Sequence, residues 1–400
     1  MTFGRDWLPY DVFDADNHFY EPPDAYTRYL EPRYRDRAFT PTGSGLLETA
    51  AGEGTHLPTM FGSDLGEGIP TPGENLVKLN PLRGLDDEQR DQLLGAFREM
   101  RPAFENRARR LELMDRQGIE AALVYGGTVS TIEYHLHRDF EVLWANVRAY
   151  NRWLDDDWGY ARDGRLYCPP LMVLTDVGEA CKELDRVLAA GARIVQMRLG
   201  PAFGRSPADP HFDPFWARLN EAKIPLATHL GWTEYARAGS AWSEDPRASY
   251  FHYDAFQWLH YWGDRPAMET VSALIFHGLF ERFPNLRVVF SEQGTVWVPY
   301  LVRKMDHAFL MGRRATFDQL TSRPSEIFQR HILVSPFPEE SLSKVVEAVG
   351  TGCLAFGSDF PHGEGLPDPS AYETMLKGLS DDEVRRIMRD NLARFLGVDA

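Results

Sequence analysis

Residues 108–126, with the sequence ARRLELMDRQGIEAALVYG, contain the pattern that decides the fold. Residues 108–117 mix charged and apolar side chains as an amphipathic helix does, Gly118 follows, and residues 119–126 form a short apolar run. A helix that leads directly into a buried strand is the unit from which parallel sheets are built. Comparable apolar runs occur at residues 10–18, 119–126, 166–174, 192–200, 224–231, 286–294, 331–337 and 353–362. We therefore predict eight strands connected by helices.

This repetition predicts an α/β fold, a single-domain (β/α)8 barrel over residues 1–400. Two stretches fit no βα unit: residues 40–82, rich in Gly, Pro and Thr, and residues 232–264, rich in Trp, Tyr and His. They follow the first and the fifth predicted strand. Long connections inside a compact domain are usually functional or disordered. We interpret residues 40–82 as an insertion covering the barrel mouth, with a disordered insertion as the alternative, and residues 232–264 as a substrate-pocket wall.

Composition limits the partners of the chain. Its 400 residues carry a formal net charge of −16, with 43% hydrophobic and 26% charged residues. Nucleic acid and anionic lipid both require clustered Lys and Arg, so we expect neither as a partner. The first ten residues lack the basic and apolar segments of a signal peptide, and no apolar run is long enough to span a membrane. We expect a cytoplasmic protein with a small-molecule substrate.

Candidate metal ligands lie at the ends of several predicted strands. Asp16 and His18 end the first strand, and strict alternation would place them on one face together with Asp14. His229 ends the fifth strand and Asp359 the eighth. The carboxyl ends of barrel strands meet at one mouth, and two imidazoles with two carboxylates suit one divalent ion, zinc or manganese. Taken alone, Asp16 and His18 also fit a turn cap and a solvated loop residue.

Several motifs of the chain resemble those of amidohydrolase family 2, which includes aminocarboxymuconate-semialdehyde decarboxylase and related aromatic-acid decarboxylases. The similarity runs in the same order over nearly the whole chain. The matching stretches are DADNH at 14–18 with Glu21-Pro22, MDRQGI at 114–119, THLG at 228–231, GLFERFPNL at 278–286 and FGSDFPH at 356–362.

The resemblance implies a distorted barrel, a mononuclear metal site, and either nonoxidative decarboxylation or hydrolysis. It places Asp16, His18, His229 and Asp359 at the positions of the family's metal ligands, and family habit suggests a homodimer. The chain departs from the family in the first strand, where Asp16 occupies a position that is histidine in many members. It departs again where the decarboxylase has a catalytic histidine, because Glu292 occupies that position.

Asp359 and Glu292 are the predicted catalytic residues. A carboxylate beside a metal-bound water or substrate can pass a proton while the ion stabilises the developing anion, which suits Asp359. A pure ligand role is the alternative for Asp359. Glu292 fits a base, a further ligand, a partner fixing a histidine tautomer or a buried hydrogen-bonded carboxylate. Glu21 fits either a metal ligand or a turn residue before Pro22, and we prefer the turn role.

Three residues are predicted to bind substrate. Arg198 ends the fourth strand and suits a substrate carboxylate, although a salt bridge to an acidic neighbour is equally consistent with its place. Trp232 begins the predicted wall, where an aromatic ring suits a flat substrate. His362 follows Asp359 by three positions and is expected at the mouth.

These residues lead to one main functional hypothesis and two alternatives. The main hypothesis is a metal-dependent carboxy-lyase, a nonoxidative decarboxylase, that acts on a small carboxylated aromatic or unsaturated acid. The first alternative is a hydrolase that cleaves an amide, ester or lactone with a metal-activated water. The second is a non-catalytic barrel that has lost its metal. No serine-hydrolase elbow, Walker loop or dinucleotide-binding glycine motif is present in the sequence.

Overall fold

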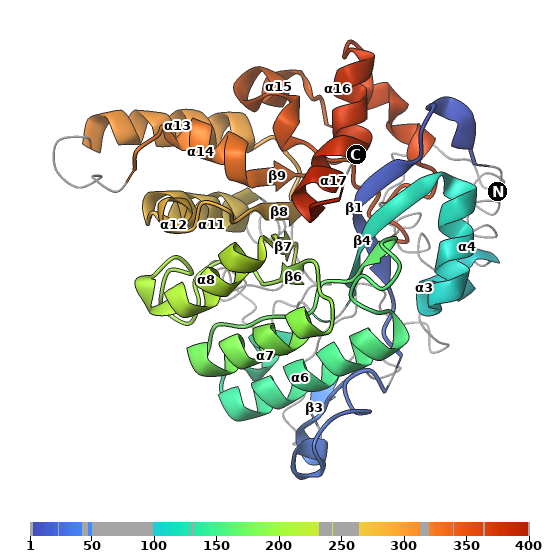
Figure 1. The fold of residues 1–400 in the computed structure, drawn as a ribbon, viewed down its shortest axis with the longest axis vertical. Coiled ribbons are helices and arrows are strands. Elements are labelled where there is room, and N and C mark those ends of the chain that lie inside the picture. The colour runs from blue at the N-terminus through green and yellow to red at the C-terminus, as the bar shows by residue number, and fades with distance from the viewer. Residues whose placement is uncertain are drawn as a thin grey trace.

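The computed structural model describes residues 3–22, 24–41, 47–49, 99–127, 129, 132–231, 242, 264–312, 320–338, 340–362 and 365–398. In these ranges strands alternate with helices, and the larger helices lie outside the strands (Figure 1). The strands are β1 (Val12–Phe19), β2 (Phe39–Pro41), β3 (Leu47–Thr49), β4 (Ile119–Gly126), β5 (Leu166–Tyr167), β6 (Val195–Gln196), β7 (Leu226–His229), β8 (Val288–Ser291) and β9 (Ile332–Val334). The helices are α3 (Pro102–Glu105), α4 (Arg107–Gln117), α5 (Ile132–Leu136), α6 (Phe140–Asp157), α7 (Val177–Ala189), α8 (Asp213–Ala222), α11 (Asp264–Phe276), α12 (Leu279–Arg282), α13 (Val298–Gly312), α14 (Pro324–His331), α15 (Ser343–Val349), α16 (Asp381–Arg385) and α17 (Asn391–Leu396).

Parallel pairing arranges the strands as a barrel does. One ladder has the order β1-β4-β5 and the other the order β6-β7-β8-β9. Isolated parallel bridges connect the ladders, from Leu171 to Gln196, from Val334 to Leu354 and from Asn17 to Phe360. Residues 354–360 therefore stand in the place of an eighth strand, although they form bridges and no continuous ladder. The predicted α/β barrel is confirmed, with most strands shorter than their apolar runs.

Side chains along the strands alternate between two hydrophobic clusters. The interior cluster takes at least one residue from each of the eight strand positions, and these residues are Phe13, Ala15, Ala121, Leu123, Tyr125, Tyr167, Ile194, Ala227, Val289, Leu333 and Ala355. Their sequence neighbours, such as Ala122, Val288 and Leu354, pack in the larger cluster that also contains helix residues. Successive side chains of a strand point to opposite faces, so this division is expected when both faces are buried.

Local sequence explains where the flanking helices begin and end. Asp139 accepts a hydrogen bond from the backbone N–H of Val142 at the start of α6, and Asp176 does the same for Glu179 at the start of α7. These side chains satisfy N–H groups that have no partner inside the helix. At the end of α4, Gly118 has φ 71°, a left-handed conformation in which glycine ends the helix without steric cost.

A bulge in β1 corrects one prediction. Asp14 is paired with Ala122 of β4 and Asn17 with Val124, so three steps along β1 match two steps along β4. The extra residue interrupts the alternation. Ala15 packs in the interior cluster, whereas Asp14 bonds to Asn17 and Ser358. The prediction that Asp14 shares a face with Asp16 and His18 was therefore wrong.

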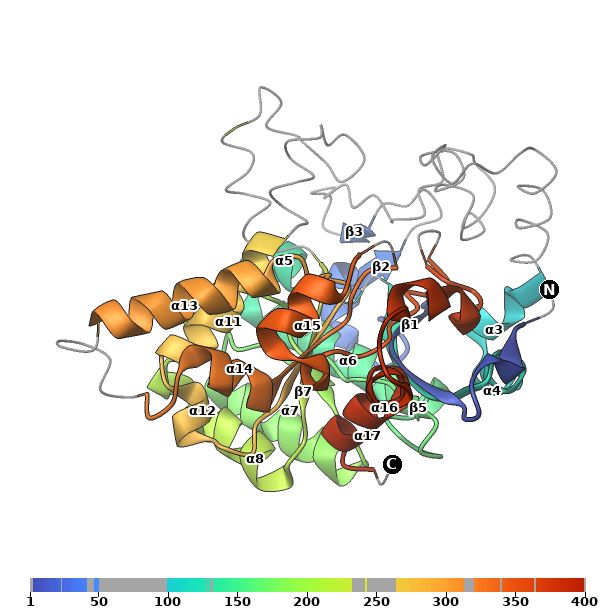
Figure 2. The ribbon, with the colours of Figure 1, turned by 90° about the horizontal axis from the view of Figure 1, so that it is seen from above.

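The two predicted insertions lie mostly outside the described residues. Of residues 40–82 the structure describes 40–41 and 47–49, which form part of the antiparallel pair of β2 and β3. Of residues 232–264 it describes only Trp242 and Asp264. Figure 2 shows β2 and β3 on one side of the barrel and α17 on the opposite side. The roles of residues 40–82 as a cover and of residues 232–264 as a pocket wall stay predictions.

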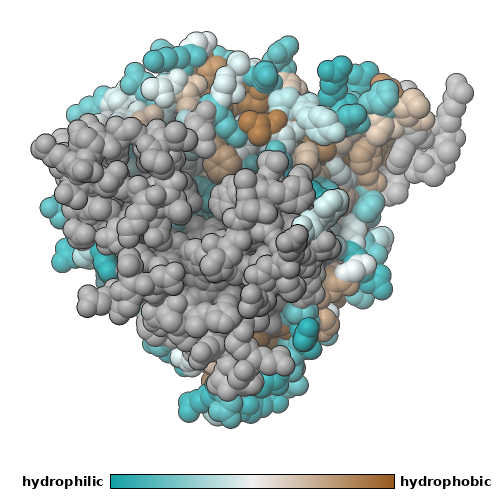
Figure 3. Space-filling view, turned by 180° about the vertical axis from the view of Figure 1, so that it is seen from behind, coloured by the Kyte–Doolittle hydropathy of each residue, from teal (hydrophilic) through white to brown (hydrophobic). Residues whose placement is uncertain are grey.

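The described surface is mainly hydrophilic on the face shown in Figure 3, with smaller apolar areas between the polar ones. Exposed large hydrophobic side chains occur in or next to α13, and they are Val296, Tyr300, Leu310 and Met311. None of the helices in the described ranges combines the length and the apolar character that crossing a bilayer requires.

Candidate metal centre

The four predicted metal ligands meet at the carboxyl ends of their strands. His229 Nε2, at the end of β7, lies 3.2 Å from Asp16 Oδ1 and 3.1 Å from His18 Nε2. His18 Nε2 lies 3.3 Å from the same Asp16 oxygen and 3.2 Å from Asp359 Oδ1. The side chains of all four residues are largely buried. The barrel thus gathers into one cluster residues that are up to 343 positions apart in the sequence.

The spacing of these atoms fits a shared cation. Bonds of about 2.1 Å from one ion, at angles between those of an octahedron and a tetrahedron, would separate neighbouring ligand atoms by about 3.0–3.4 Å. The separations of 3.1–3.3 Å fall in this range. One imidazole nitrogen cannot hydrogen-bond to three neighbours at once, since it carries at most one proton. Two overlapping groups can hold an ion: Asp16, His18 and His229, and His18, Glu292, Asp359 and His362.

The ring of His229 is oriented for coordination through Nε2. Its Nδ1 lies 2.7 Å from the carbonyl oxygen of Leu230, and a carbonyl can only accept. Nδ1 therefore carries the proton, and the lone pair of the neutral ring is on Nε2, which faces the cluster. A backbone carbonyl commonly fixes the tautomer of metal-binding histidines in this way.

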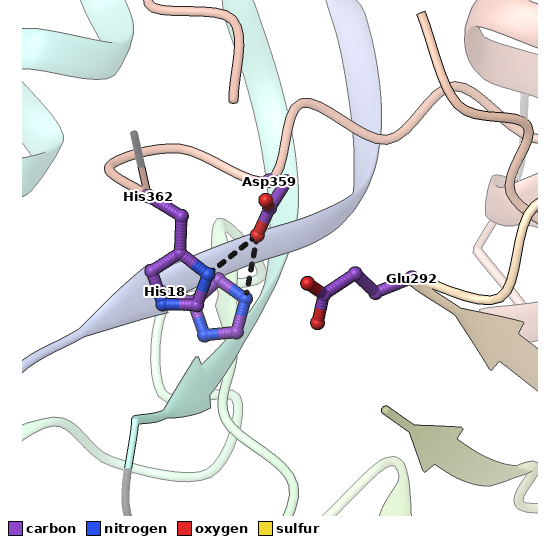
Figure 4. Close-up of side chains that lie close together, drawn as sticks. All are labelled: His18, Glu292, Asp359 and His362. Carbon is purple, nitrogen blue, oxygen red and sulfur yellow. Dashed lines mark ion pairs between the residues drawn. The ribbon is translucent and has the colours of Figure 1, made fainter. Parts of the chain in front are cut away.

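The two predicted catalytic carboxylates share an unusual backbone conformation. Glu292 follows β8 with φ 52°, and Asp359 has φ 53°. Residues other than glycine rarely adopt positive φ, and such strain is concentrated at functional sites. In Figure 4 the side chains of Glu292 and Asp359 extend from different segments toward His18, and dashed lines join Asp359 to His18 and His362.

Electrostatic interactions keep the site carboxylates ionised. Burial raises the pKa of Asp16, but the neighbouring His229 and His18 outweigh it and hold that pKa well below its usual range. For Asp359 burial also acts upward, and His362 and His18 reverse it, so its pKa is lowered. Asp14, with no imidazole beside it, has its pKa raised by burial to about 6 despite hydrogen bonds from Ser358 and Asn17. The carboxylates of the cluster are therefore anionic when positive charge, from ring protons or from a bound cation, lies beside them.

Sequence reasoning missed the residues that hold the ligands in place. Asp14 accepts hydrogen bonds from the backbone N–H of Asp16, at 3.0 Å, and of Ser358, at 2.9 Å, and so connects the segments that carry Asp16 and Asp359. Arg110 of α4 is fully buried and donates to the side chain of Asn17 and the carbonyl of His18. The sequence did contain a signal for the role of Asp14, namely a charged residue within an apolar strand. It contained none for Arg110, which in the sequence is indistinguishable from the exposed charged residues of the same helix.

Tyr125 forms part of the floor of the site, and it too was not predicted. Its ring centroid lies 4.7 Å from that of His229 and 5.9 Å from that of His18. Its hydroxyl is 2.9 Å from Ser291 Oγ, and Ser291 donates to the carbonyl of Ala15 at 2.7 Å. These contacts connect β4, β8 and β1 directly below the imidazoles.

The predicted substrate residues have different surroundings. Arg198 forms an ion pair with Glu133 and donates to the carbonyl of Pro201 at 2.8 Å. Its salt bridge, one of the two interpretations of this residue, is thus present, and substrate binding by Arg198 stays a prediction. His362 is buried, stacks on His18 at 3.8 Å and places Nδ1 2.7 Å from Asp359 Oδ1. Trp232 lies outside the described residues.

Glu21 is occupied away from the cluster. Its oxygens accept hydrogen bonds from the backbone N–H of Gly127 at 3.1 Å and of Val129 at 3.2 Å, and from the hydroxyl of Tyr26 at 3.0 Å. It therefore connects the segment after β1 to the segment after β4, which favours a structural role over metal binding.

A (β/α)8 barrel with a histidine–carboxylate centre at its mouth defines a class of metal-dependent enzymes, and comparison with known proteins agrees. The sequence model of the amidohydrolase family matches residues 13–398. An amidohydrolase from Mycobacterium avium subsp. paratuberculosis K-10 is 32% identical, with 98% of this chain and 100% of that chain covered and a TM-score of 0.80. The chain therefore belongs to the amidohydrolase family and is an enzyme of that superfamily.

Two further relatives are decarboxylases. A 2-amino-3-carboxymuconate-6-semialdehyde decarboxylase from Dictyostelium discoideum is 27% identical over 146 residues, which are 36% of this chain and 40% of that protein. A dihydroxybenzoic acid decarboxylase from Polaromonas sp. JS666, with bound manganese and the inhibitor 2-nitroresorcinol, has a TM-score of 0.59 at 14% identity, with 97% of each chain covered. The second likeness shows the fold.

Proposed function

We propose that the chain is a metal-dependent carboxy-lyase that decarboxylates a small carboxylated aromatic or unsaturated acid without an oxidant. The observation that carries the proposal is the convergence of Asp16, His18, His229 and Asp359. Atoms of the first three lie 3.1–3.3 Å from one another, and His18 Nε2 lies 3.2 Å from Asp359 Oδ1. The decarboxylase relatives support this reaction over others of the superfamily, and the manganese in the Polaromonas protein favours manganese as the ion.

In this proposal the bound divalent ion supplies a Lewis acid that stabilises negative charge on substrate oxygens as the carbon–carboxylate bond breaks. Carbon dioxide leaves, and the electron pair of the broken bond remains on the substrate carbon. That carbon must then accept a proton. Asp359 is the proton carrier that we favour, because its Oδ1 faces the cluster, with His18 Nε2 at 3.2 Å and His362 Nδ1 at 2.7 Å. A catalytic role of Glu292 is retained as a prediction.

The burial of the cluster assists this chemistry. His18, Asp16 and Glu292 are each at most 5% exposed, so water has little access to the proton on its way to carbon. Fixed charges also act more strongly where water is excluded. The predicted wall, residues 232–264 with Trp232, would bind the flat part of the substrate, and Arg198 its carboxylate.

One observation favours a second function. The relative that is 32% identical, with 98% of this chain covered, is named an amidohydrolase, and that name denotes hydrolysis. In a hydrolase Asp359 would accept the proton of a metal-activated water, and an amide, ester or lactone would be cleaved. A non-catalytic barrel finds no support, since the metal-binding groups are intact.

The test combines metal analysis with product detection. Wild-type protein should contain about one equivalent of manganese or zinc per chain, and His229→Ala should lose it. Wild-type protein loaded with manganese should release carbon dioxide from at least one member of a panel of hydroxybenzoates and unsaturated carboxylic acids. His229→Ala should be slower by at least about a hundredfold, since even partners of metal ligands contribute about 10–100-fold.

The matched control is His277→Ala, which removes an exposed histidine bonded to Ser206 on the outside of the barrel, and it should keep metal and activity. Cleavage of amides or lactones without release of carbon dioxide would replace the carboxy-lyase with the hydrolase. Equal metal content in wild type and His229→Ala would contradict the proposed centre. The homodimer and the cytoplasmic location also stay predictions.

A further inference from the structure

Glu292 lies at the edge of the proposed metal centre. Its Oε2 is 3.4 Å from His229 Nε2, close to the separations between the four proposed ligands. One oxygen of Glu292 also lies within 4.8 Å of ligand atoms of His18 and Asp359. The residue is 5% exposed, and Figure 4 shows its carboxylate directed toward Asp359 and His18. It therefore faces the same small volume as the proposed ligands.

Contacts of residues 293–297 hold the backbone next to Glu292 in place. Thr295 donates to Glu340 Oε2 through its backbone N–H at 2.8 Å and its hydroxyl at 2.6 Å. Gly294 packs so closely that a Cβ there would lie 2.4 Å from Glu340 Oε1 and 2.6 Å from the Phe337 ring. The indole N–H of Trp297 donates to the carbonyl of Gln293 at 3.1 Å. A side chain on such a fixed segment is preorganised for one position, as ligands require.

The local charges favour a cation near Glu292. Asp16, Asp359 and Glu292 bring three buried carboxylates to two overlapping groups of potential ligands, which share His18. Like charges at such separations repel strongly in a buried site unless a cation or a proton compensates them. His362 has a different geometry, because its Nδ1 makes a 2.7 Å contact with Asp359 Oδ1 and its ring stacks on His18. Glu292 Oε2, by contrast, lies 3.4 Å from His229 Nε2, close to the spacing between the proposed ligands.

We infer that Glu292 is a fifth protein ligand of the metal ion, beside Asp16, His18, His229 and Asp359. This inference rests on the metal centre of the proposed function. The donors are then three carboxylates and two imidazoles, an oxygen-rich set. Carboxylates suit manganese, whereas structural and catalytic zinc sites usually take three or four protein ligands with more nitrogen or sulfur. Glu292 thus shifts the preference of the site from zinc toward manganese.

The experiment measures metal binding by the full chain and does not depend on the substrate. Metal-free wild type, Glu292→Gln and Glu21→Gln are titrated with Mn²⁺ and with Zn²⁺ in competition with a chelator. Their unfolding temperatures are recorded with and without metal. We expect Glu292→Gln to weaken Mn²⁺ binding by at least about tenfold and Zn²⁺ binding by less. Glu21→Gln removes a buried carboxylate that is bonded to backbone N–H groups, and its Mn²⁺ affinity should equal that of the wild type.

The metal-free unfolding temperature separates a ligand from a structural carboxylate. Glu292→Gln removes one like charge from the cluster, so the metal-free variant should unfold at the same temperature as the metal-free wild type or at a higher one. The rise in unfolding temperature on adding Mn²⁺ should be smaller in the variant than in the wild type. If Glu292→Gln does not fold, Glu292→Asp keeps the charge but withdraws it by one methylene, and the same loss of Mn²⁺ affinity is expected. Unchanged Mn²⁺ affinity in the folded variant would overturn the inference and leave the proposed function standing. Failure of the wild type to bind either ion would overturn both.

Discussion

Asp14 and Asp16 are two positions apart but perform different tasks, because the bulge in β1 turns them to different sides of the strand. Asp16 faces the imidazoles at 3.2–3.3 Å. Asp14 accepts the backbone N–H groups of Asp16 and Ser358 and has a raised pKa of about 6. Imidazoles thus lie beside the carboxylate of Asp16, whereas backbone N–H groups surround that of Asp14. The identity of a residue therefore does not define its role until its neighbours are known.

His331 allows a prediction about pH dependence. Burial lowers its pKa below the ordinary 6.5, although its hydrogen bond to the carbonyl of Leu286, at 2.7 Å, acts in the opposite direction. The folded protein thus favours the neutral ring, and below pH 6.5 the unfolded chain binds more protons. Stability from this residue is present above about pH 6.5 and is lost as the pH falls through the lowered pKa. We expect the free energy of unfolding in urea to fall less steeply from pH 7.5 to 5.5 in His331→Gln than in the wild type.

This comparison should be made on metal-free protein, so that release of the ion does not contribute. The exposed His277 supplies the control for replacement of a histidine by glutamine, and the slope of His331→Gln is compared with that of His277→Gln as well as with the wild type. Identical slopes for His331→Gln and the wild type would show that His331 does not contribute to the acid sensitivity of the fold.

At the scale of elements, α4 supports the strand that carries Asp16 and His18, β1, through one side chain. Arg110 donates to the carbonyl of Ala103 at 2.8 Å, to Asn17 and to the carbonyl of His18, and its guanidinium lies 5.4 Å from the Phe360 ring centroid. Burial lowers its pKa to about 10, so it remains charged at neutral pH. Only a planar guanidinium reaches several acceptors in fixed directions.

Arg110→Lys should therefore destabilise the fold by about 1–3 kcal/mol, because buried acceptors on Asn17 and His18 lose their donor. Urea unfolding measures this difference. The adjacent Arg109, whose side chain is 62% exposed, is the matched control, and Arg109→Lys should change stability by no more than about 0.5 kcal/mol. Equal stability of the two variants would mean that the contacts of Arg110 add nothing to the fold.

At the scale of the whole molecule, α17 closes the end of the barrel opposite the metal centre. Its Leu392, Ala393, Phe395 and Leu396 pack in the same cluster as the interior residues of the strands. The last helix of the chain thus seals the core that the first strand begins. Stability of the whole barrel should depend on this helix although it is far from the site.

Leu392→Ala should lower the free energy of unfolding by about 2–5 kcal/mol, because it removes a fully buried side chain and leaves a cavity. Leu310→Ala, at a leucine 54% exposed on α13, should cost no more than about 0.5 kcal/mol. Chemical denaturation of both variants tests the prediction, and a Leu392→Ala variant as stable as Leu310→Ala would show that α17 does not seal the core.

Much of this architecture could be predicted because it depends on local patterns. The strand at Ile119–Gly126 has the predicted bounds, and β1, β5, β6, β7, β8 and β9 fall within or beside their apolar runs. The short pair of β2 and β3 was not predicted, and residues 353–362 form isolated bridges in place of the eighth strand. The positions of Asp16, His18, His229 and Asp359 followed from one rule, that parallel strands of a barrel end at the same mouth. These conclusions need only the order of residues along the chain and the geometry of a βα unit.

Tertiary contacts decided the rest, because they join residues whose relation no local pattern records. The bulge that separates Asp14 from Asp16 appears only when β1 pairs with β4. The partner of Arg198 is Glu133, 65 positions away, and the carboxylate of Asp14 bonds to Ser358, 344 positions away. The sequence by itself determined the class of fold, and it predicted four residues, Asp16, His18, His229 and Asp359, that the folded chain brings together at the ends of strands. Only the folded chain decided which charges face a cation and which are bonded elsewhere, because that depends on distances between segments far apart in sequence.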